Sequence, residues 1–87
     1  MWGFGIGEGL TRWQAVLLIN RAKNVSLAAN RPNPGFTDVP KDYPYYEAIA
    51  AAVDEGLFAG TSAKKFEPNK IMTRSEMAAV LQRIYSL

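Results

Sequence analysis

The chain has 87 residues, no cysteine, no histidine and a formal net charge of +2. This length accommodates one small domain with a single modest core. Without cysteine there is no disulfide framework or thiolate chemistry, and without histidine the commonest general base and neutral metal ligand are missing. We therefore expect no enzymatic activity, no cofactor and no metal site. The pI near 9.1 falls short of the dense Lys and Arg footprint of a dedicated nucleic-acid binder.

The first helix is predicted from about Arg12 to Lys23. Thr11 is followed three residues later by Gln14, which is the spacing of a capping box. The i, i+3, i+4, i+7 spacing predicts an apolar face made of Ala15, Leu18, Ile19 and Ala22. Residues 30–35, Asn-Arg-Pro-Asn-Pro-Gly, are predicted to form a linker because no helix tolerates them.

The second helix is predicted to begin near Pro44, since proline suits the first helical position, and to end at Gly56. Asp42 is its better N-cap candidate by residue type. Its inward face is expected to consist of Ala48, Ile49, Ala52 and Val53.

A long loop from Gly56 to Ile71 follows, and loops of this length usually have a function. Its expected apolar anchors are Leu57, Phe58 and Phe66. The third helix is predicted from Arg74 to about Tyr85, with one apolar stripe formed by Met77, Val80, Leu81 and Ile84. The pattern predicts an all-α fold, a small bundle of about three helices with long ordered loops.

A short phrase occurs twice in the chain, as residues 10–14 (Leu-Thr-Arg-Trp-Gln) and 72–76 (Met-Thr-Arg-Ser-Glu). Each copy begins a predicted helix and has the spacing of a capping box, Thr11 with Gln14 and Thr73 with Glu76. An arginine just inside each helix, Arg12 or Arg74, meets the positive end of the helix dipole at a cost of roughly 0.3–1 kcal/mol. We therefore expect a negative group beside it. Free N–H groups and a guanidinium together predict an anion site.

The repeated phrase also predicts the domain organisation, because only its second copy follows a complete helix and loop. We divide the chain into residues 1–29, the C-terminal part of one repeat, a linker at 30–35, and one whole repeat at 36–87. No apolar stretch is long enough to span a bilayer, and residues 1–8 lack the features of a signal peptide. If the parent protein is exported, we expect this chain to be a piece of it.

Five short blocks of the second repeat resemble, in order and spacing, the S-layer homology domain. They are residues 36–40 (Phe-Thr-Asp-Val-Pro), 47–49 (Glu-Ala-Ile), 56–60 (Gly-Leu-Phe-Ala-Gly), 66–69 (Phe-Glu-Pro-Asn) and 72–76. The family pattern reads approximately F-x-D-V, a helix ending in G-I-x-x-G, F-x-P-N and I-T-R-A-E. Residues 1–27 resemble only the last third of a preceding copy.

The resemblance implies a non-enzymatic module on the surface of bacteria, usually in sets of three around a pseudo-threefold bundle. Such modules hold exported proteins on the cell wall by binding a secondary polysaccharide, often one with pyruvate ketals. The family's motif arginine, which contacts the acidic sugar, corresponds to Arg74 and to Arg12. Where the family commonly has His-Trp-Ala, this chain has Tyr43-Pro44-Tyr45, so Tyr45 or Tyr46 either supplies an aromatic face instead or packs inside.

Arg74 is thus the predicted central ligand contact, and the secondary candidates are Arg12, Asp38, Gly60 and Asn69. The alternative for Arg74 is a solvated arginine whose charge is offset by Glu76. Asp38 is also a candidate local cap of backbone N–H groups. The side chains of Thr11, Gln14, Thr73 and Glu76 are expected mainly to cap helices. Trp13 either stacks on a sugar or packs against the neighbouring repeat.

Other functional classes fit the sequence less well. A glycan hydrolase needs two facing carboxylates, and no acidic residue here stands in a context that raises its pKa. A helix-turn-helix needs a much shorter turn than the loop after Gly56. A protein-interaction or assembly module without glycan binding is the main alternative. Because the predicted core is thin, we also expect self-association or packing against neighbouring repeats, with no nucleic-acid partner and no membrane insertion.

Overall fold

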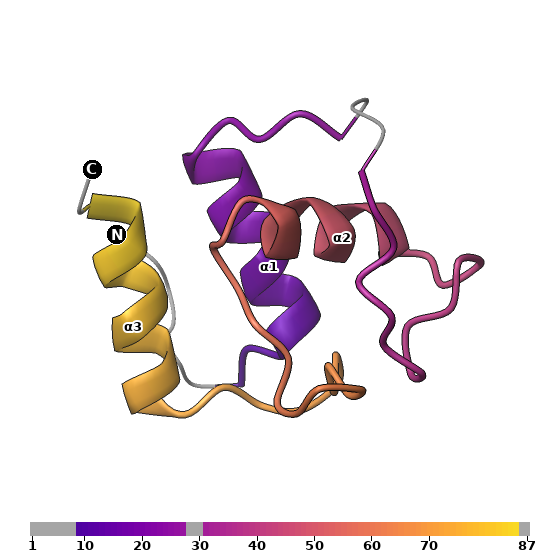
Figure 1. Cartoon of the computed structure of the whole chain (residues 1–87). Coiled ribbons are helices and arrows are strands. Elements are labelled where there is room, and N and C mark those ends of the chain that lie inside the picture. Colours follow the sequence, from indigo (N-terminus) through magenta and orange to yellow (C-terminus); the bar gives the residue numbers. More distant parts are fainter. Residues whose placement is uncertain (1–8, 28–30, 86–87) are drawn as a thin grey trace.

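The computed structural model describes residues 9–27 and 31–85, which contain three helices and no strand. Helix α1 spans Arg12–Ala22, α2 spans Tyr46–Asp54 and α3 spans Arg74–Tyr85. In Figure 1, α1 and α3 begin at the same end of the molecule, and α2 crosses α1. Helix α1 packs against both α2 and α3 and is therefore the central helix. The predicted all-α fold class is confirmed.

One core joins the helices to the loops around them. Phe66 is fully buried, and the rings of Phe36 and Phe58 lie 5.3 Å and 6.0 Å from its ring. The predicted loop anchors Phe58 and Phe66 are therefore core residues. The helical part of this core consists of Ala15, Val16, Ile19, Ala48, Ile49, Ala52, Met77 and Val80. Residues before and after the linker thus share one core, while the division into repeats stays a prediction.

The helix bounds agree with the predicted ones for α3, and α1 ends one residue early, at Ala22. The predicted start of α2 is wrong. Pro44 lies in a tight turn in which the N–H of Tyr46 donates to the carbonyl oxygen of Tyr43 at 3.0 Å, so the helix begins only after this turn. The N-cap is Tyr45, which makes no side-chain capping bond, and Gly56 follows the helix with φ of 75°.

The buried face of α1 agrees with the predicted one at Ala15 and Ile19 and differs from it at other positions. Arg12, Val16 and Asn20 are buried, whereas Ala22 is exposed. Residues four apart lie on one face of a helix, so these three form a single stripe that contains two polar side chains. The Asn20 side-chain amide donates to the carbonyl oxygen of Ala48 at 3.0 Å and links α1 to α2. On α3, Met77 and Val80 are buried, and the side chain of Ile84 lies outside the described residues.

Both capping boxes expected from the sequence are present. The N–H of Thr73 donates to Glu76 Oε1 at 2.8 Å, and the N–H of Glu76 donates to Thr73 Oγ1 at 3.1 Å. The same reciprocal pair joins Thr11 and Gln14 on α1. The two helices therefore begin with the same local chemistry.

Arg31 is tied to the C-terminal end of α2. Arg31 Nη1 lies 2.9 Å from a carboxylate oxygen of both Asp54 and Glu55, and its Nη2 donates to the carbonyl oxygen of Ser26 at 2.8 Å. Because carboxylates at a helix C-terminus meet the negative end of the dipole, this arginine offsets an unfavourable pair of charges. None of the helices in residues 9–27 and 31–85 is long and apolar enough to cross a membrane.

The capping box of α3 predicts the effect of Thr73→Ala. The substitution removes the hydroxyl that accepts from the N–H of Glu76, so the free energy of unfolding should fall by about 1 kcal/mol. Urea melts measure the change, and Thr73→Ser, which keeps the acceptor, should remain close to the parent protein. An unchanged urea midpoint for Thr73→Ala would contradict the capping role.

Candidate functional site

The first turn of α1 donates all its free N–H groups to the protein itself. The N–H of Arg12 donates to the carbonyl oxygen of Lys70 and that of Trp13 to Pro68, each at 3.0 Å. The N–H of Gln14 donates to Thr11 Oγ1 at 3.3 Å. A β-bridge between Thr11 and Ile71 runs alongside these bonds. The loop of residues 56–71 therefore occupies the N-terminus of α1, where the sequence predicts an anion.

The guanidinium of Arg12 is buried in the same loop. Its Nε donates to the carbonyl oxygen of Phe66 at 2.8 Å, and its Nη2 donates to that of Ala59. Its central carbon lies 4.6 Å from the centre of the Phe66 ring and 5.6 Å from that of Phe58, within the range of cation–π attraction. Burial lowers the pKa of Arg12, and the charge of Glu76 opposes this shift. Arg12 thus has a packing environment rather than an open anion site.

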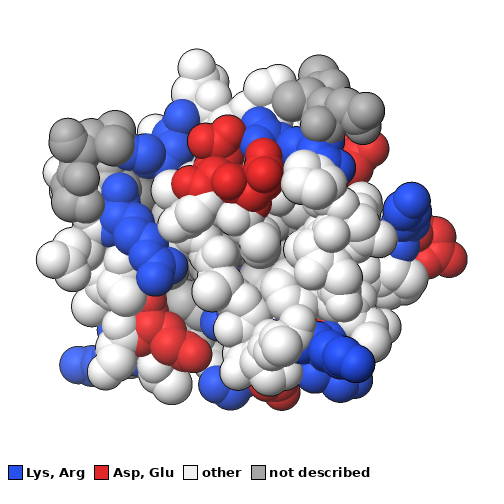
Figure 2. Space-filling model, viewed as in Figure 1, with Lys and Arg blue, Asp and Glu red and all other residues white. Residues whose placement is uncertain are grey.

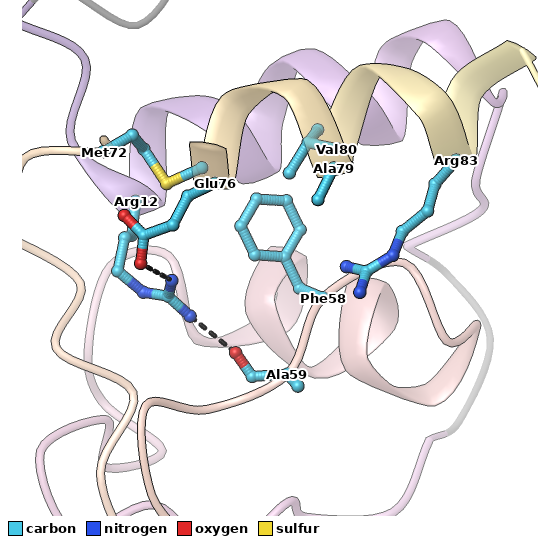
Figure 3. Close-up of a pocket in the computed structure, with 8 residues that line it drawn as sticks. All are labelled: Arg12, Phe58, Ala59, Met72, Glu76, Ala79, Val80 and Arg83. Carbon is cyan, nitrogen blue, oxygen red and sulfur yellow. Dashed lines mark hydrogen bonds and ion pairs between the residues drawn. The ribbon is translucent and has the colours of Figure 1, made fainter. Parts of the chain in front are cut away.

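A small pocket of about 150 Å³ lies beside this arginine, and we call it the Arg12 pocket. Figure 3 shows the Phe58 ring between the side chains of Arg12 and Arg83, with Glu76 next to Arg12. Glu76 Oε2 lies 3.8 Å from Arg12 Nη1, and Arg83 Nη1 donates to the carbonyl oxygen of Leu57 at 2.8 Å. The lining residues are Arg12, Phe58, Ala59, Met72, Glu76, Ala79, Val80 and Arg83. The negative group expected beside the first motif arginine is therefore Glu76 of the second motif.

Arg74 occupies the same motif position on α3 but has a different environment. Its side chain is exposed and makes no hydrogen bond or ion pair with the residues that the structure describes. The N–H groups of Arg74 and Ser75 precede the first helical bond, from Met77 N–H to the Thr73 carbonyl oxygen, and so have no intrahelical acceptor. The N-terminus of α3 therefore keeps the open donors that α1 has lost.

Asp38 caps backbone N–H groups, but the expectation of a local cap is wrong. Its two carboxylate oxygens accept from the N–H groups of Phe66 at 3.0 Å and Glu67 at 2.8 Å, 28 and 29 residues further along the chain. Burial raises the pKa of Asp38, but the N–H groups of Phe66 and Glu67, its own N–H and the charge of Lys65 together outweigh this effect and hold the pKa below its ordinary value. Asp38 is thus the residue that fixes the start of the Phe-Glu-Pro-Asn block.

An open hollow of about 470 Å³ lies next to this block, and we call it the Tyr43 hollow. It is lined by Asp38, Tyr43, Glu67, Pro68, Asn69 and Lys70. Two predicted site residues, Asp38 and Asn69, therefore meet here, while Arg74 and Gly60 line neither the hollow nor the Arg12 pocket. Sequence reasoning missed Glu67 and Tyr43, because only the fold brings them beside Asp38.

Gly60 and the aromatic residues near the site have packing roles. A Cβ at Gly60 would clash with the ring of Phe36 and with the carbonyl oxygens of Lys65 and Ser62. Trp13 stacks on Tyr45, with ring centres 4.1 Å apart and an interplanar angle of 5°, and Tyr45 meets Tyr43 edge-on at 5.9 Å. One face of Tyr45 is thus covered by Trp13. No group of three or more acidic side chains in the described ranges is arranged to hold a metal ion.

The two motif arginines provide a matched pair of substitutions. Arg12→Met leaves the buried carbonyl oxygen of Phe66, and the partly buried one of Ala59, without their guanidinium donor, so the free energy of unfolding should fall by about 3 kcal/mol. Arg74→Met alters an exposed side chain at the same motif position and should stay within about 0.5 kcal/mol of the parent. Chemical denaturation of both variants measures the difference. Equal losses would contradict the distinct environments.

Comparisons with known proteins agree with this geometry. The family model of the S-layer homology domain matches residues 35–78, which include Asp38, the Phe-Glu-Pro-Asn block and the second Thr-Arg motif. The "Surface-layer 125 kDa protein" of Lysinibacillus sphaericus is 37% identical over 87 aligned residues, which cover 93% of this chain and 7% of that protein. An "Endoglucanase" of Bacillus sp. (strain KSM-635) is 28% identical over 89 aligned residues, covering 94% of this chain and 8% of that protein.

The chain therefore spans less than a tenth of either relative. One relative is named for a surface layer and the other for an enzyme, yet both contain a segment similar to this small helical unit. The matched family model covers half of the chain, and the first relative aligns with nearly all of it. On this evidence the chain belongs to the S-layer homology domain family.

Proposed function

We propose that this module attaches its parent protein to the bacterial cell wall by binding an acidic secondary polysaccharide, with Arg74 as the central contact. Membership of the S-layer homology family supports a non-catalytic wall-anchoring role in general. The names of the two relatives support a place at the cell surface, as part of a larger exported protein. The proposal also specifies that the polysaccharide is acidic, for example because its sugars carry pyruvate ketals.

The observation that carries the proposal is the difference between Arg74 and Arg12. A cation at the positive end of a helix is unfavourable unless an anion is near, and Arg12 has Glu76 and two carbonyl oxygens beside it. Arg74 has no such partner among the described residues and lies beside two open N–H groups. A carboxylate of the polysaccharide would meet both the guanidinium and these donors.

The other predicted site residues have smaller binding or positioning roles in this proposal. Asn69 offers a free amide in the Tyr43 hollow, and Asp38 holds the loop that carries it. Gly60 keeps the neighbouring loop compact. Arg12 is accessible to a ligand only where its guanidinium lines the Arg12 pocket. A glycan is thus expected to lie across the end of the molecule where α1 and α3 begin.

Binding of wall polysaccharide should depend on Arg74. Arg74→Ala removes a charge-assisted contact, and we expect a loss of about 2 kcal/mol where the pair is desolvated. Arg74→Lys should restore the binding only in part because an ammonium lacks the fork geometry. Calorimetry with purified polymer, before and after chemical removal of ketal pyruvate, measures both effects. Lys64→Ala, which removes one exposed charge elsewhere, is the control, and equal affinities of Arg74→Ala and the parent would refute the proposal.

A second candidate function is assembly without glycan binding, and the environment of α1 favours it. The loop of residues 56–71 accepts the N–H groups of Arg12 and Trp13 and encloses the Arg12 side chain. The same loop of another repeat would fit the N-terminus of α3 in the same way. Loss of polysaccharide binding in Arg74→Ala, with binding to a protein partner retained, supports the first function, whereas a parent protein that binds a protein partner and no polysaccharide supports the second.

Self-association is expected at an apolar groove of about 150 Å³ between α1 and α3. Ala15, Leu18, Val80 and Leu81 contribute to its lining, and Tyr85 at its end is 83% exposed. Figure 2 shows charged side chains mainly around the edge of this view, with uncharged residues across its centre. The proposed occupant is a helix of a second copy of this chain. The groove is lined by the apolar stripes of both α1 and α3, and either stripe of a second copy would offer similar apolar side chains.

Association linked to folding should make the melting temperature rise with protein concentration. Leu81→Lys should abolish this dependence by placing a charge in the groove, whereas Gln82→Lys on the adjacent exposed position should preserve it. Light scattering behind a sizing column gives the mass directly. A compact monomer at all concentrations, with a constant melting temperature, would contradict self-association.

A further inference from the structure

The backbone of Phe66 is held from both sides by charged side chains. Its N–H donates to Asp38 Oδ1 at 3.0 Å, and its carbonyl oxygen accepts from Arg12 Nε at 2.8 Å. The N–H of Glu67 donates to Asp38 Oδ2 at 2.8 Å. Hydrogen bonds connected through one peptide segment polarise and strengthen one another. One carboxylate and one guanidinium therefore fix the loop at the point where Phe66 enters the core.

Glu67 has a strained backbone conformation. Its φ is +54°, in the left-handed region, which is costly for a residue with a Cβ. Such a conformation persists only where surrounding contacts hold it. Here they are the bond from the N–H of Glu67 to Asp38 and the bond from the N–H of Lys70 to the Glu67 carbonyl oxygen at 3.1 Å. Loss of the bond to Asp38 would therefore let the backbone relax away from this conformation.

Residues 66–70, which we call the latch segment, close over the start of α1. The carbonyl oxygen of Pro68 accepts the N–H of Trp13 at 3.0 Å. The carbonyl oxygen of Lys70 accepts the N–H of Arg12 at the same distance. Both carbonyl groups come shortly after the strained residue, so their positions depend on its conformation. The latch segment thus covers α1 only while its own beginning is held.

Protonation of Asp38 would weaken this hold. An ionised carboxylate accepts on both oxygens, whereas protonation turns one oxygen into a donor, so the two N–H groups can no longer both be bound strongly. The pKa of Asp38 is below its ordinary value, near 3.8, although burial raises it. A carboxylate with a lowered pKa stabilises the closed form at neutral pH, and this contribution is lost as the pH falls from the ordinary value toward the lowered one.

A second carboxylate near Arg12 titrates in the same range. The bond from the N–H of Thr73 lowers the pKa of Glu76 more than burial raises it, and the charges of Lys70 and Arg12 lower it further. Around Asp38 itself, the charged and titratable groups are Arg12, Tyr43, Lys65, Glu67 and Lys70. The effects of Asp38 and Glu76 therefore have to be separated by experiment.

We propose that Asp38 is an acid-sensitive latch: when ionised it holds residues 66–70 closed over the start of α1, and when protonated it lets this segment open while the helices stay folded. The opening stays local because the bond that links α1 to α2, from Asn20 to the carbonyl oxygen of Ala48, does not involve the latch segment. This device is separate from the proposed polysaccharide binding, since it concerns only how the loop is held.

Amide hydrogen exchange of the full chain, followed by nuclear magnetic resonance and corrected for the intrinsic exchange rate, tests the latch between about pH 6 and about pH 2.5. The N–H groups of Trp13, Phe66 and Glu67 should lose protection at acid pH, roughly tenfold for each unit by which the closed form lowers the pKa of Asp38. The N–H of Ala52, inside α2, should keep its protection. Protection of Phe66 and Glu67 that is constant with pH, or that falls equally at Ala52, would overturn the proposal.

Substitutions identify the group that titrates. Asp38→Asn is neutral at every pH, so its latch segment should be open near neutral pH and respond little to acid. Asp42→Asn, at an exposed aspartate of the same loop, is the matched control and should behave like the parent. Glu76→Gln removes the carboxylate near Arg12 but keeps a capping side chain, as Gln14 does on α1.

The response of Glu76→Gln decides between the two carboxylates. An acid response that persists in this variant supports Asp38 as the latch. Loss of the response in Glu76→Gln assigns it to Glu76 and refutes the proposal. The parent and Glu76→Gln suffice for this decision even where Asp38→Asn fails to fold.

Discussion

One buried arginine, Arg12, connects the central helix α1 to the loop of residues 56–71. Arg12 begins the central helix, and its guanidinium bonds to the carbonyl oxygens of Ala59 and Phe66 and lies over two phenylalanine rings. A buried cation needs such partners because loss of hydration is otherwise costly. The loop from residue 56 to 71, which has no regular secondary structure, therefore has a fixed course around this side chain. The loop residues that line the Arg12 pocket and the Tyr43 hollow depend on that course.

The two Thr-Arg motifs show how one local sequence serves two purposes. Both have the same capping box, so the residues nearest in sequence do not distinguish them. What differs is the neighbour, because a loop covers the start of α1 and leaves the start of α3 open. The same motif thus contacts a distant loop of the chain at α1 and leaves its arginine exposed at α3.

Electrostatics divides the end of the molecule where α1 and α3 begin into two regions. Arg74 and the open N–H groups of α3 favour an anion, whereas the Tyr43 hollow is lined by charges of both signs, Asp38, Glu67 and Lys70. Glu76 lies between them, within 4 Å of both Arg12 and Lys70.

The sequence by itself determined the all-α class, the bounds of α3, both capping boxes and the family. Each of these depends on residues close together in the chain, where apolar periodicity and capping spacing act directly. The sequence also singled out Arg12, Arg74 and Asp38, but it did not determine which arginine is buried or which N–H groups Asp38 caps. Only the tertiary structure decided that Arg12, Val16 and Asn20 face the core, that Asp38 bonds to a loop 28 residues away, and that Glu67 and Tyr43 share a hollow. These features arise from contacts between distant segments, and the patterns of a single segment carry no information about which distant segment will cover it.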